Sequence, residues 1–467
     1  MYNYFIKLRV CTGEKYMKKQ DFVFYELNPS QEVVKLQCQY TLFKRVINIV
    51  CSVSTKEEID FDLMKKTFNL AIERNDCARI RFVKKGGKLM QYFLPEYKYE
   101  DIPVLKFKTK EEQKEFIQKQ TKTAVKYMKG EVVKPYFINT FDGKCMIFLK
   151  VCHLNFDIYG LNVFIKDLFG VYESLKFNKD LPEKPKNFED VVKKDIQIKN
   201  NEEKKKEDYE YFKNIFENNP EPYYAGVDGI TNRHVVKARN KNQNKVKLFF
   251  IKNDTKMFGH SVPKSTSDNL LKLAQNAKIS LANVLLYAFC VTQSKMNGNV
   301  EYLLPLELCN LRGTLTEKKC AGTKAQSLNC YTKVIQDMSF AENLQNFAKT
   351  QNENYRHIGM KDLETQMLLH KTYKSSMMST YYSLTFSFIP YEKDEKLDIR
   401  YYSNGKCALP LYVAVMYDYI NNEINIGYDG QVQLMTEQNI EQFHKNLILC
   451  LNQILENPEI KIKDIML

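Results

Sequence analysis

His153 and Asp157 are the residues whose types and spacing could do chemistry. They lie in KCMIFLKVCHLNFDIYGLNVFIKDLFGVYESL, residues 144–175, where an alternating strand pattern gives way to a helical one. The alternation predicts that His153 ends an apolar row and that Cys152 faces the other side of the strand. A Cys-His nucleophile pair is excluded, because its side chains must be within hydrogen-bond reach. An imidazole at a strand end could act as a general base, since its ordinary pKa lies near neutrality.

Asp157 directly precedes the predicted helix, which Gly160 opens. The apolar spacing predicts a buried helix face made of Val163, Phe164, Leu168, Val171, Tyr172 and Leu175. A carboxylate suits a helix N-terminus, where it can accept from free backbone N–H groups. On spacing alone, a helix cap and a packing histidine remain the alternatives to catalysis.

Other kinds of site find little support in the sequence. The GxxxxGK[ST], GxGxxG, HExxH and GxSxG patterns are absent, and the twelve cysteines are scattered without zinc spacing. We therefore predict no metal site and expect the cysteines to be small core residues. The remaining histidines have no obvious catalytic partner and are predicted to be surface or packing residues: His234, His260, His357, His370 and His444.

Composition favours a folded protein of two or three units. The chain has 467 residues, of which 44% are apolar and 27% charged. Neither a signal peptide nor a run of about 18 apolar residues is visible, so we predict a cytoplasmic protein without membrane spans. The formal charge of +14 is spread along the chain rather than concentrated in a stripe, which argues against nucleic-acid binding. The same charge would attract an acidic partner.

Strands and helices are mixed in both halves of the chain. Helical spacing predicts helices in residues 60–76, 109–128, 278–298 and 436–458, with Ser280 as an N-cap, and Gly86-Gly87 predicts a hairpin. Two prolines and a charge run mark residues 181–204 as a crossing segment. These features predict two α/β lobes with mixed sheets, residues 1–180 and 205–467.

The HLNFD stretch and the helix after it resemble the HHxxxDG segment of nonribosomal peptide synthetase condensation domains. These domains belong to the HxxxD acyltransferases, which share the chloramphenicol acetyltransferase-like fold. LNPSQEVVKL is similar to the family's opening segment, and ERNDCARIRF to its RHxxLRxxF segment, with Asn75 and Ala78 at two of the positions. ISLANVLLYAF, LELCNLRG and YDGQVQLMTEQNIEQFHKNLILCL are similar to later family segments, in the family's order.

The resemblance implies two chloramphenicol acetyltransferase-like lobes in a V, with a central tunnel and His153 at its middle. A thioester on the phosphopantetheine arm of a carrier protein or of coenzyme A would enter from one side, and an amine or alcohol from the other. No permanently bound cofactor is implied. His153 would take the acceptor's proton or orient the acceptor. Asp157 would pair with an arginine and hold the histidine loop, and we predict Arg79 as that arginine, with Arg81 as the alternative.

Two departures from the family pattern bear on activity. Cys152 stands at the family's first histidine, and Ile158 replaces the glycine after the aspartate, where it would be strained if the position needs a positive φ. Gly160 is expected to restore some space. Three residues that would reach the tunnel are candidates for donating a hydrogen bond to the oxyanion: Ser383, Ser387 and Asn310. The alternative is that their side chains only form local hydrogen bonds.

The predicted function is that of a condensation-domain-like acyltransferase. It would form an amide or an ester in nonribosomal peptide or related secondary metabolite biosynthesis, acting as a monomer on a carrier protein in trans or on acyl-coenzyme A. A catalytically silent module that recruits carrier proteins is the alternative, which Cys152 and Ile158 would permit.

Overall fold

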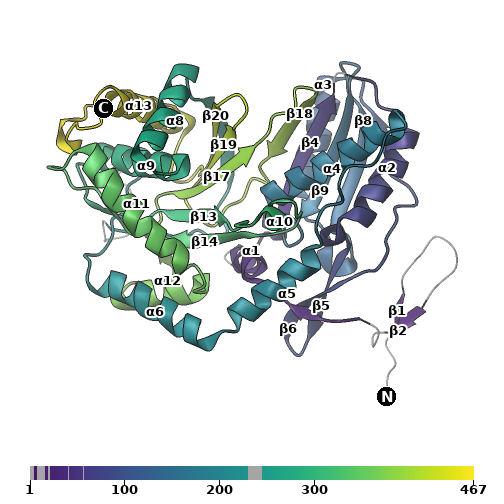
Figure 1. Cartoon of the computed structure of the whole chain (residues 1–467), viewed down its shortest axis with the longest axis horizontal. Coiled ribbons are helices and arrows are strands. Elements are labelled where there is room, and N and C mark those ends of the chain that lie inside the picture. Colours follow the sequence, from purple (N-terminus) through teal and green to yellow (C-terminus); the bar gives the residue numbers. More distant parts are fainter. Residues whose placement is uncertain (1–4, 8–15, 19–21, 40, 56, 230–243) are drawn as a thin grey trace.

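The two halves of the chain lie side by side, the first on the right of Figure 1 and the second on the left. The structure is a computed structural model that describes residues 5–7, 16–18, 22–39, 41–55, 57–229 and 244–467. In this part of the chain no helix is both long enough and apolar enough to cross a membrane. The cytoplasmic location stays a prediction.

The first half is built around a five-stranded sheet in the order β18-β4-β9-β8-β7. Its strands are β4 (Asn48–Thr55), β7 (Val104–Lys106), β8 (Val133–Asn139), β9 (Cys145–Cys152) and β18 (Leu397–Tyr402). Helices α2 (Phe61–Arg74) and α4 (Ile158–Lys176) pack against one face through a core that includes Phe68 and Phe164. Helix α3 (Lys110–Lys122) covers the other face, where Phe116 contacts Phe148.

Helix α3 ends earlier than the helical pattern predicts. Asn48, on the neighbouring strand β4, donates to the carbonyls of Thr121 and Thr123 and accepts from Val125 N. The buried Lys150 also donates to the Thr123 carbonyl. Because side chains of the sheet bind these last carbonyls, the chain leaves the helix at Thr123 instead of continuing to residue 128.

Smaller elements complete the first half. A three-stranded sheet contains β3 (Tyr25–Glu26), β6 (Lys88–Phe93) and β5 (Ile80–Lys85), and the last two form the predicted hairpin at Gly86-Gly87, which is confirmed. β1 (Phe5–Lys7) pairs with β2 (Tyr16–Lys18), and α1 (Pro29–Gln39) lies near the centre of Figure 1. The short 3-10 helices are η2 (Lys44–Ile47), η3 (Asp76–Arg79), η4 (Tyr127–Lys129) and, in the second half, η5 (Ile462–Asp464).

The second half has a six-stranded mixed sheet in the order β11-β20-β19-β17-β13-β14. The strands are β11 (Thr255–Ser261), β13 (Leu306–Asn310), β14 (Ala325–Asn329), β17 (Thr385–Tyr391), β19 (Leu411–Asp418) and β20 (Glu423–Gln431). Two short pairs, β10 (Val246–Lys247) with β16 (Ser379–Thr380) and β12 (Tyr302–Leu303) with β15 (Thr332–Lys333), lie outside it. Its helices are α6 (Glu202–Glu217), α8 (Lys264–Ala277), α9 (Leu281–Met296), α10 (Leu315–Lys318), α11 (Phe340–Arg356), α12 (Asp362–Thr372) and α13 (Glu437–Glu456).

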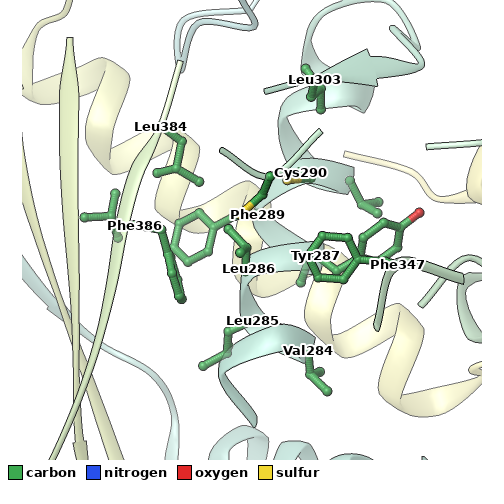
Figure 2. Packing of buried hydrophobic residues seen from close by; sticks show 14 of the residues in the cluster. Val284, Leu285, Leu286, Tyr287, Phe289, Cys290, Leu303, Phe347, Leu384 and Phe386 are labelled. Atoms are coloured by element: carbon green, nitrogen blue, oxygen red, sulfur yellow. The ribbon is translucent and has the colours of Figure 1, made fainter. Parts of the chain in front are cut away.

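Helix α9 forms the centre of the second core. Ser280 caps it by accepting from Asn283 N, so the predicted N-cap is confirmed. Figure 2 shows its side chains packed between the sheet and α11, with Phe289 toward Phe386 and Tyr287 beside Phe347. Both faces of α9 are buried, which explains an apolar pattern too continuous for a surface helix.

Two segments of the second half join the first. β18 pairs antiparallel with β4, with Tyr401 opposite Cys51, and Cys320 and Ala321 belong to the first half's core. In the predicted crossing segment 181–204, residues 188–199 form helix α5 (Phe188–Lys199), which lies below the centre of Figure 1, between α6 and the β5–β6 hairpin. The α/β class with mixed sheets is confirmed, while the division at residues 181–204 stays a prediction.

Candidate active site

His153 is held by its backbone where β9 ends. Its N–H donates to Ile47 O at 2.7 Å, and its carbonyl accepts from Thr323 Oγ1 at 2.6 Å. The residue is partly exposed, and its Nδ1 is buried without a hydrogen-bond partner among the described residues. Burial lowers the pKa of His153, although the nearby Asp157 carboxylate opposes the shift. The imidazole is therefore uncharged near neutral pH and can accept a proton.

Asp157 is the centre of a buried cluster that holds the histidine loop. Oδ1 accepts from Gly160 N at 2.6 Å, so the predicted capping of α4 is confirmed. Oδ2 accepts from the backbone N–H groups of Lys324 at 2.7 Å and Ala325 at 3.0 Å. Arg312 donates to both oxygens, from Nη1 at 3.0 Å and from Nη2 at 3.1 Å. Burial alone would raise the pKa of Asp157, but the Arg312 charge and these hydrogen bonds outweigh it and lower the pKa.

The prediction that Arg79 pairs with Asp157 is wrong. Arg79 donates instead to the carbonyls of Ile72, Leu94 and Pro95, which fixes the turn after α2. The alternative, Arg81, lies with its guanidinium 4.4 Å from the Tyr97 ring centroid. Arg312, in the quoted segment LELCNLRG, lies 155 residues from Asp157 in sequence. It reaches Asp157 where the segment between β13 and β14, residues 311–324, contacts the first half.

Gly160 permits the close approach of this loop. A Cβ at residue 160 would overlap the backbone N and O of Gly322 and would lie 3.0 Å from Arg312 Nη2. Gly322 itself has a φ of +126°, and a side chain there would overlap Phe188. Ile158 is the first residue of α4 and does not adopt a positive φ, so the anticipated strain at this position does not arise.

Cys152 is the last residue of β9, and its position on the face opposite His153 stays a prediction. It is fully buried, and burial raises the pKa of its thiol, so it is not a thiolate nucleophile. The other described histidines have partners that agree with packing roles. His260 stacks on His444, and hydrogen bonds join His357 Nδ1 to Asp208 and His370 Nδ1 to Ser375. His234 lies outside the described residues.

Two cavities lie between segments of the two halves. The larger, of about 1100 Å³, is lined by α4 residues such as Asn162 and Lys166, by loop 182–185, by segment 390–397 and by Asn310. The smaller, of about 40 Å³, lies between α1 and the β13 residues Leu306 and Leu308. His153 does not line either cavity, so the continuous tunnel past it stays a prediction.

The three oxyanion candidates differ in their surroundings. Asn310 Oδ1 accepts from Arg312 Nη1 at 2.8 Å and therefore lies beside the Asp157 cluster. Ser387 is buried on β17, and Ser383, just before that strand, has a buried Oγ without a partner among the described residues. Their role toward an oxyanion stays a prediction.

Replacing Thr323 with valine is expected to misplace His153. Thr323 is fully buried, and valine keeps its shape but leaves the His153 carbonyl without its donor. We expect kcat to fall about 10-fold or more with little change in KM, and Thr323→Ser to restore most of the loss. Steady-state kinetics of the two variants test this, and equal rates for valine and serine would contradict it.

The pH dependence should report the lowered pKa of His153. A proton-accepting imidazole must be neutral, so kcat/KM is expected to fall about tenfold per pH unit below that pKa. The midpoint should lie below the ordinary histidine value of about 6.5 because burial lowers the pKa. A pH–rate profile measures it, and a midpoint above about 7 would contradict the described environment.

The chain belongs to the condensation-domain family. The family model, described as "Condensation domain", matches residues 22–467. A plipastatin synthase subunit from Bacillus subtilis (strain 168) is 20% identical over 428 residues, which are 90% of this chain but 16% of that protein. The chain thus spans only a small part of that relative.

Solved structures share the fold. The first condensation domain of the calcium-dependent antibiotic synthetase, in complex with a substrate analogue, has a TM-score of 0.77 at 14% identity, covering 95% of this chain and 100% of that one. The starter condensation domain of rhizomide synthetase, as a mutant in complex with C8-CoA and Leu-SNAC, also has a TM-score of 0.77 at 14% identity and covers 95% and 96%. The predicted fold and family are confirmed, and with them the acyltransferase class to which condensation domains belong.

Proposed function

We propose that this chain transfers an acyl group from a phosphopantetheine thioester to an amine or hydroxyl acceptor. The proposal rests on one observation above all: a neutral imidazole whose Nδ1 has no partner among the described residues, on a loop that a buried arginine–aspartate pair holds between the two halves. The proposed setting is the biosynthesis of a nonribosomal peptide or a related secondary metabolite.

In the proposed reaction His153 accepts the proton of the acceptor as its nitrogen or oxygen attacks the thioester carbonyl. A new C–N or C–O bond forms, and the carbonyl becomes a tetrahedral oxyanion, for which Ser383, Ser387 and Asn310 remain the candidates. Collapse of this intermediate breaks the C–S bond, and the proton from His153 ends on the thiolate that leaves. Asp157 takes no proton in this scheme, because Arg312 keeps its pKa low.

The donor is proposed to be a carrier protein in trans or acyl-coenzyme A. A related structure contains C8-CoA, which supports coenzyme A as one form of the donor. The formal charge of +14 supports an acidic carrier as the other. We also propose that the chain acts as a monomer, since both halves of the site come from one chain.

Turnover separates the enzyme from a silent module that only recruits a carrier. The wild-type protein is incubated with octanoyl-coenzyme A, or with an octanoyl-loaded carrier protein, and a panel of amines and alcohols. Release of free thiol that depends on the acceptor, together with a matching amide or ester in mass spectrometry, is expected. Carrier binding with thiol release at the uncatalysed rate would support the silent module.

A further inference from the structure

The N-terminus of α1 is closed by a hydrogen-bonded capping box. Asn28 directly precedes the helix, and its Oδ1 accepts from Gln31 N at 2.8 Å. In return, Gln31 Oε1 accepts from Asn28 N at 2.9 Å. Pro29 occupies the first helical position, where an N–H would have no acceptor within the helix. The box uses only the oxygen of the Gln31 side chain, so the amide nitrogen can donate elsewhere.

The amide nitrogen of Gln31 reaches the loop that carries His153. Nε2 donates to the carbonyl of Leu154, the residue after His153, at 2.9 Å, and to Gln91 Oε1 at 2.7 Å. Gln91 Nε2 donates back to Gln31 Oε1 at 2.7 Å. Both N–H groups and both acceptor positions of the Gln31 amide are therefore in use. Because Leu154 O can only accept and Asn28 N can only donate, these partners fix the orientation of the amide.

Asn28 reaches the same loop through Thr323. Its Nδ2 donates to Thr323 O at 3.2 Å, and Thr323 Oγ1 donates to His153 O at 2.6 Å. One member of the capping box thus holds the Leu154 carbonyl directly, and the other supports the donor to the His153 carbonyl. Asn28, Gln31 and Thr323 are all 0% exposed, so bulk water is not at hand to replace a lost donor.

Hydrogen bonds fix three successive peptide groups around His153. The first is held by His153 N, which donates to Ile47 O at 2.7 Å, and the second by the acceptor bond at His153 O. The third is held at both ends, because Leu154 O accepts from α1 and Asn155 N donates to Cys152 O at 2.9 Å. Since the peptide groups define the φ and ψ of the residues they join, these bonds set the direction of the His153 side chain.

We propose that Gln31 is a positioning residue for acyl transfer, which holds the His153 imidazole in place through the carbonyl of Leu154. The inference rests on the proposed function, because it concerns the same imidazole. None of the described side-chain hydrogen bonds of Gln31 involves the ring, so its effect on the reaction passes through the backbone. A reacting group misplaced by about 1 Å can lower the rate about 10²-fold. Loss of this donor should therefore reduce kcat and leave KM nearly unchanged.

Gln91 provides a matched control. It lies on β6, is also 0% exposed and shares the amide pair with Gln31. Its other described side-chain hydrogen bond goes to the carbonyl of Glu26 and not to the loop that carries His153. The Gln91→Met variant therefore leaves the bond from Gln31 Nε2 to Leu154 O in place. If Gln31 only tied α1 to the three-stranded sheet, methionine at either position should have the same effect.

Steady-state kinetics with octanoyl-coenzyme A and the best acceptor compare the two variants. Gln31→Met is expected to lower kcat about 10- to 100-fold, with KM within about twofold of the wild-type value. Gln91→Met is expected to keep kcat within about twofold, even if both variants unfold at a lower temperature. If Gln31→Met does not fold, Gln31→Asn, which keeps the amide but is one methylene shorter, is compared with Gln91→Asn. Equal kcat values in the two matched variants, lowered or not, would overturn the proposal.

An NMR titration separates a failure of this inference from a failure of the proposed function. The imidazole signal of His153, assigned by its loss in His153→Ala, reports the pKa of the ring without turnover. Burial lowers this pKa in the wild type, so a loop released by Gln31→Met should raise it by about 0.5 or more toward the ordinary value. If no variant turns over a thioester, this measurement decides. A rise in Gln31→Met but not in Gln91→Met supports the positioning role, and equal pKa values in both overturn it.

Discussion

Arg312→Met is expected to destabilise the protein by about 3–5 kcal/mol, because it leaves the Asp157 carboxylate buried without its cation. The two side chains are 1% and 6% exposed, and their closest N–O distance is 3.0 Å. The backbone donors of Gly160, Lys324 and Ala325 remain, but they carry no full charge. Urea unfolding at neutral pH measures the loss.

The sign of the pH dependence follows from the pKa of Asp157, which is lowered in the folded wild type. The pair stabilises the protein above the unfolded value of about 3.9, and this contribution is lost as the pH falls through the lower folded pKa. In Arg312→Met, burial without the cation raises the pKa of Asp157. The difference in the free energy of unfolding between the wild type and Arg312→Met should therefore become smaller as the pH falls from about 7 to about 4.

Two further variants isolate the pair. The double variant Arg312→Met, Asp157→Asn has no uncompensated charge. It should therefore be more stable than Arg312→Met alone by at least about 1 kcal/mol. Arg356→Met removes the exposed pair with Glu353 and should cost no more than about 0.5 kcal/mol. A loss in Arg312→Met as small as that in Arg356→Met would contradict the described cluster.

His153→Ala is expected to lower kcat/KM for acyl transfer by about 10²- to 10⁴-fold, the usual contribution of a general base. The fold should persist, because residue 153 is held through its backbone N–H and carbonyl, which alanine retains. Progress curves with octanoyl-coenzyme A and the best acceptor of the panel give the rate, and thermal unfolding verifies the structure.

The control for this prediction is His260→Ala, on the edge strand β11, which should keep nearly full activity. If His153→Ala retained more than about a third of the wild-type rate, the imidazole would be orienting groups at most, and proton transfer would have to be assigned elsewhere.

The sequence predicted the site where the determinants are local. Period-two alternation placed His153 at the end of strand β9, and the N-terminal position of Asp157 predicted its capping of α4. Gly160 was identified from its place beside the motif, although the reason for it, the backbone of Gly322, lies in another part of the chain.

The partner of Asp157 could not be predicted from local pattern. Arg79 and Arg312 both lie in family-like segments, and the choice between them depends on where the segment between β13 and β14, residues 311–324, contacts the first half. The pairing of β18 with β4 of the first half could not be predicted either. LDIRYY reads as an edge strand, but nothing in it indicates which sheet it joins.

The most direct test of the central claim, that a phosphopantetheine arm can bring its thioester to the His153 imidazole, is alkylation by bromoacetyl-coenzyme A. Peptide mass spectrometry locates the adducts, with and without an excess of octanoyl-coenzyme A. We expect one adduct on His153 that forms at low reagent concentration and is suppressed by the competitor. Adducts confined to other residues, with His153 unmodified at full inactivation, would contradict the claim.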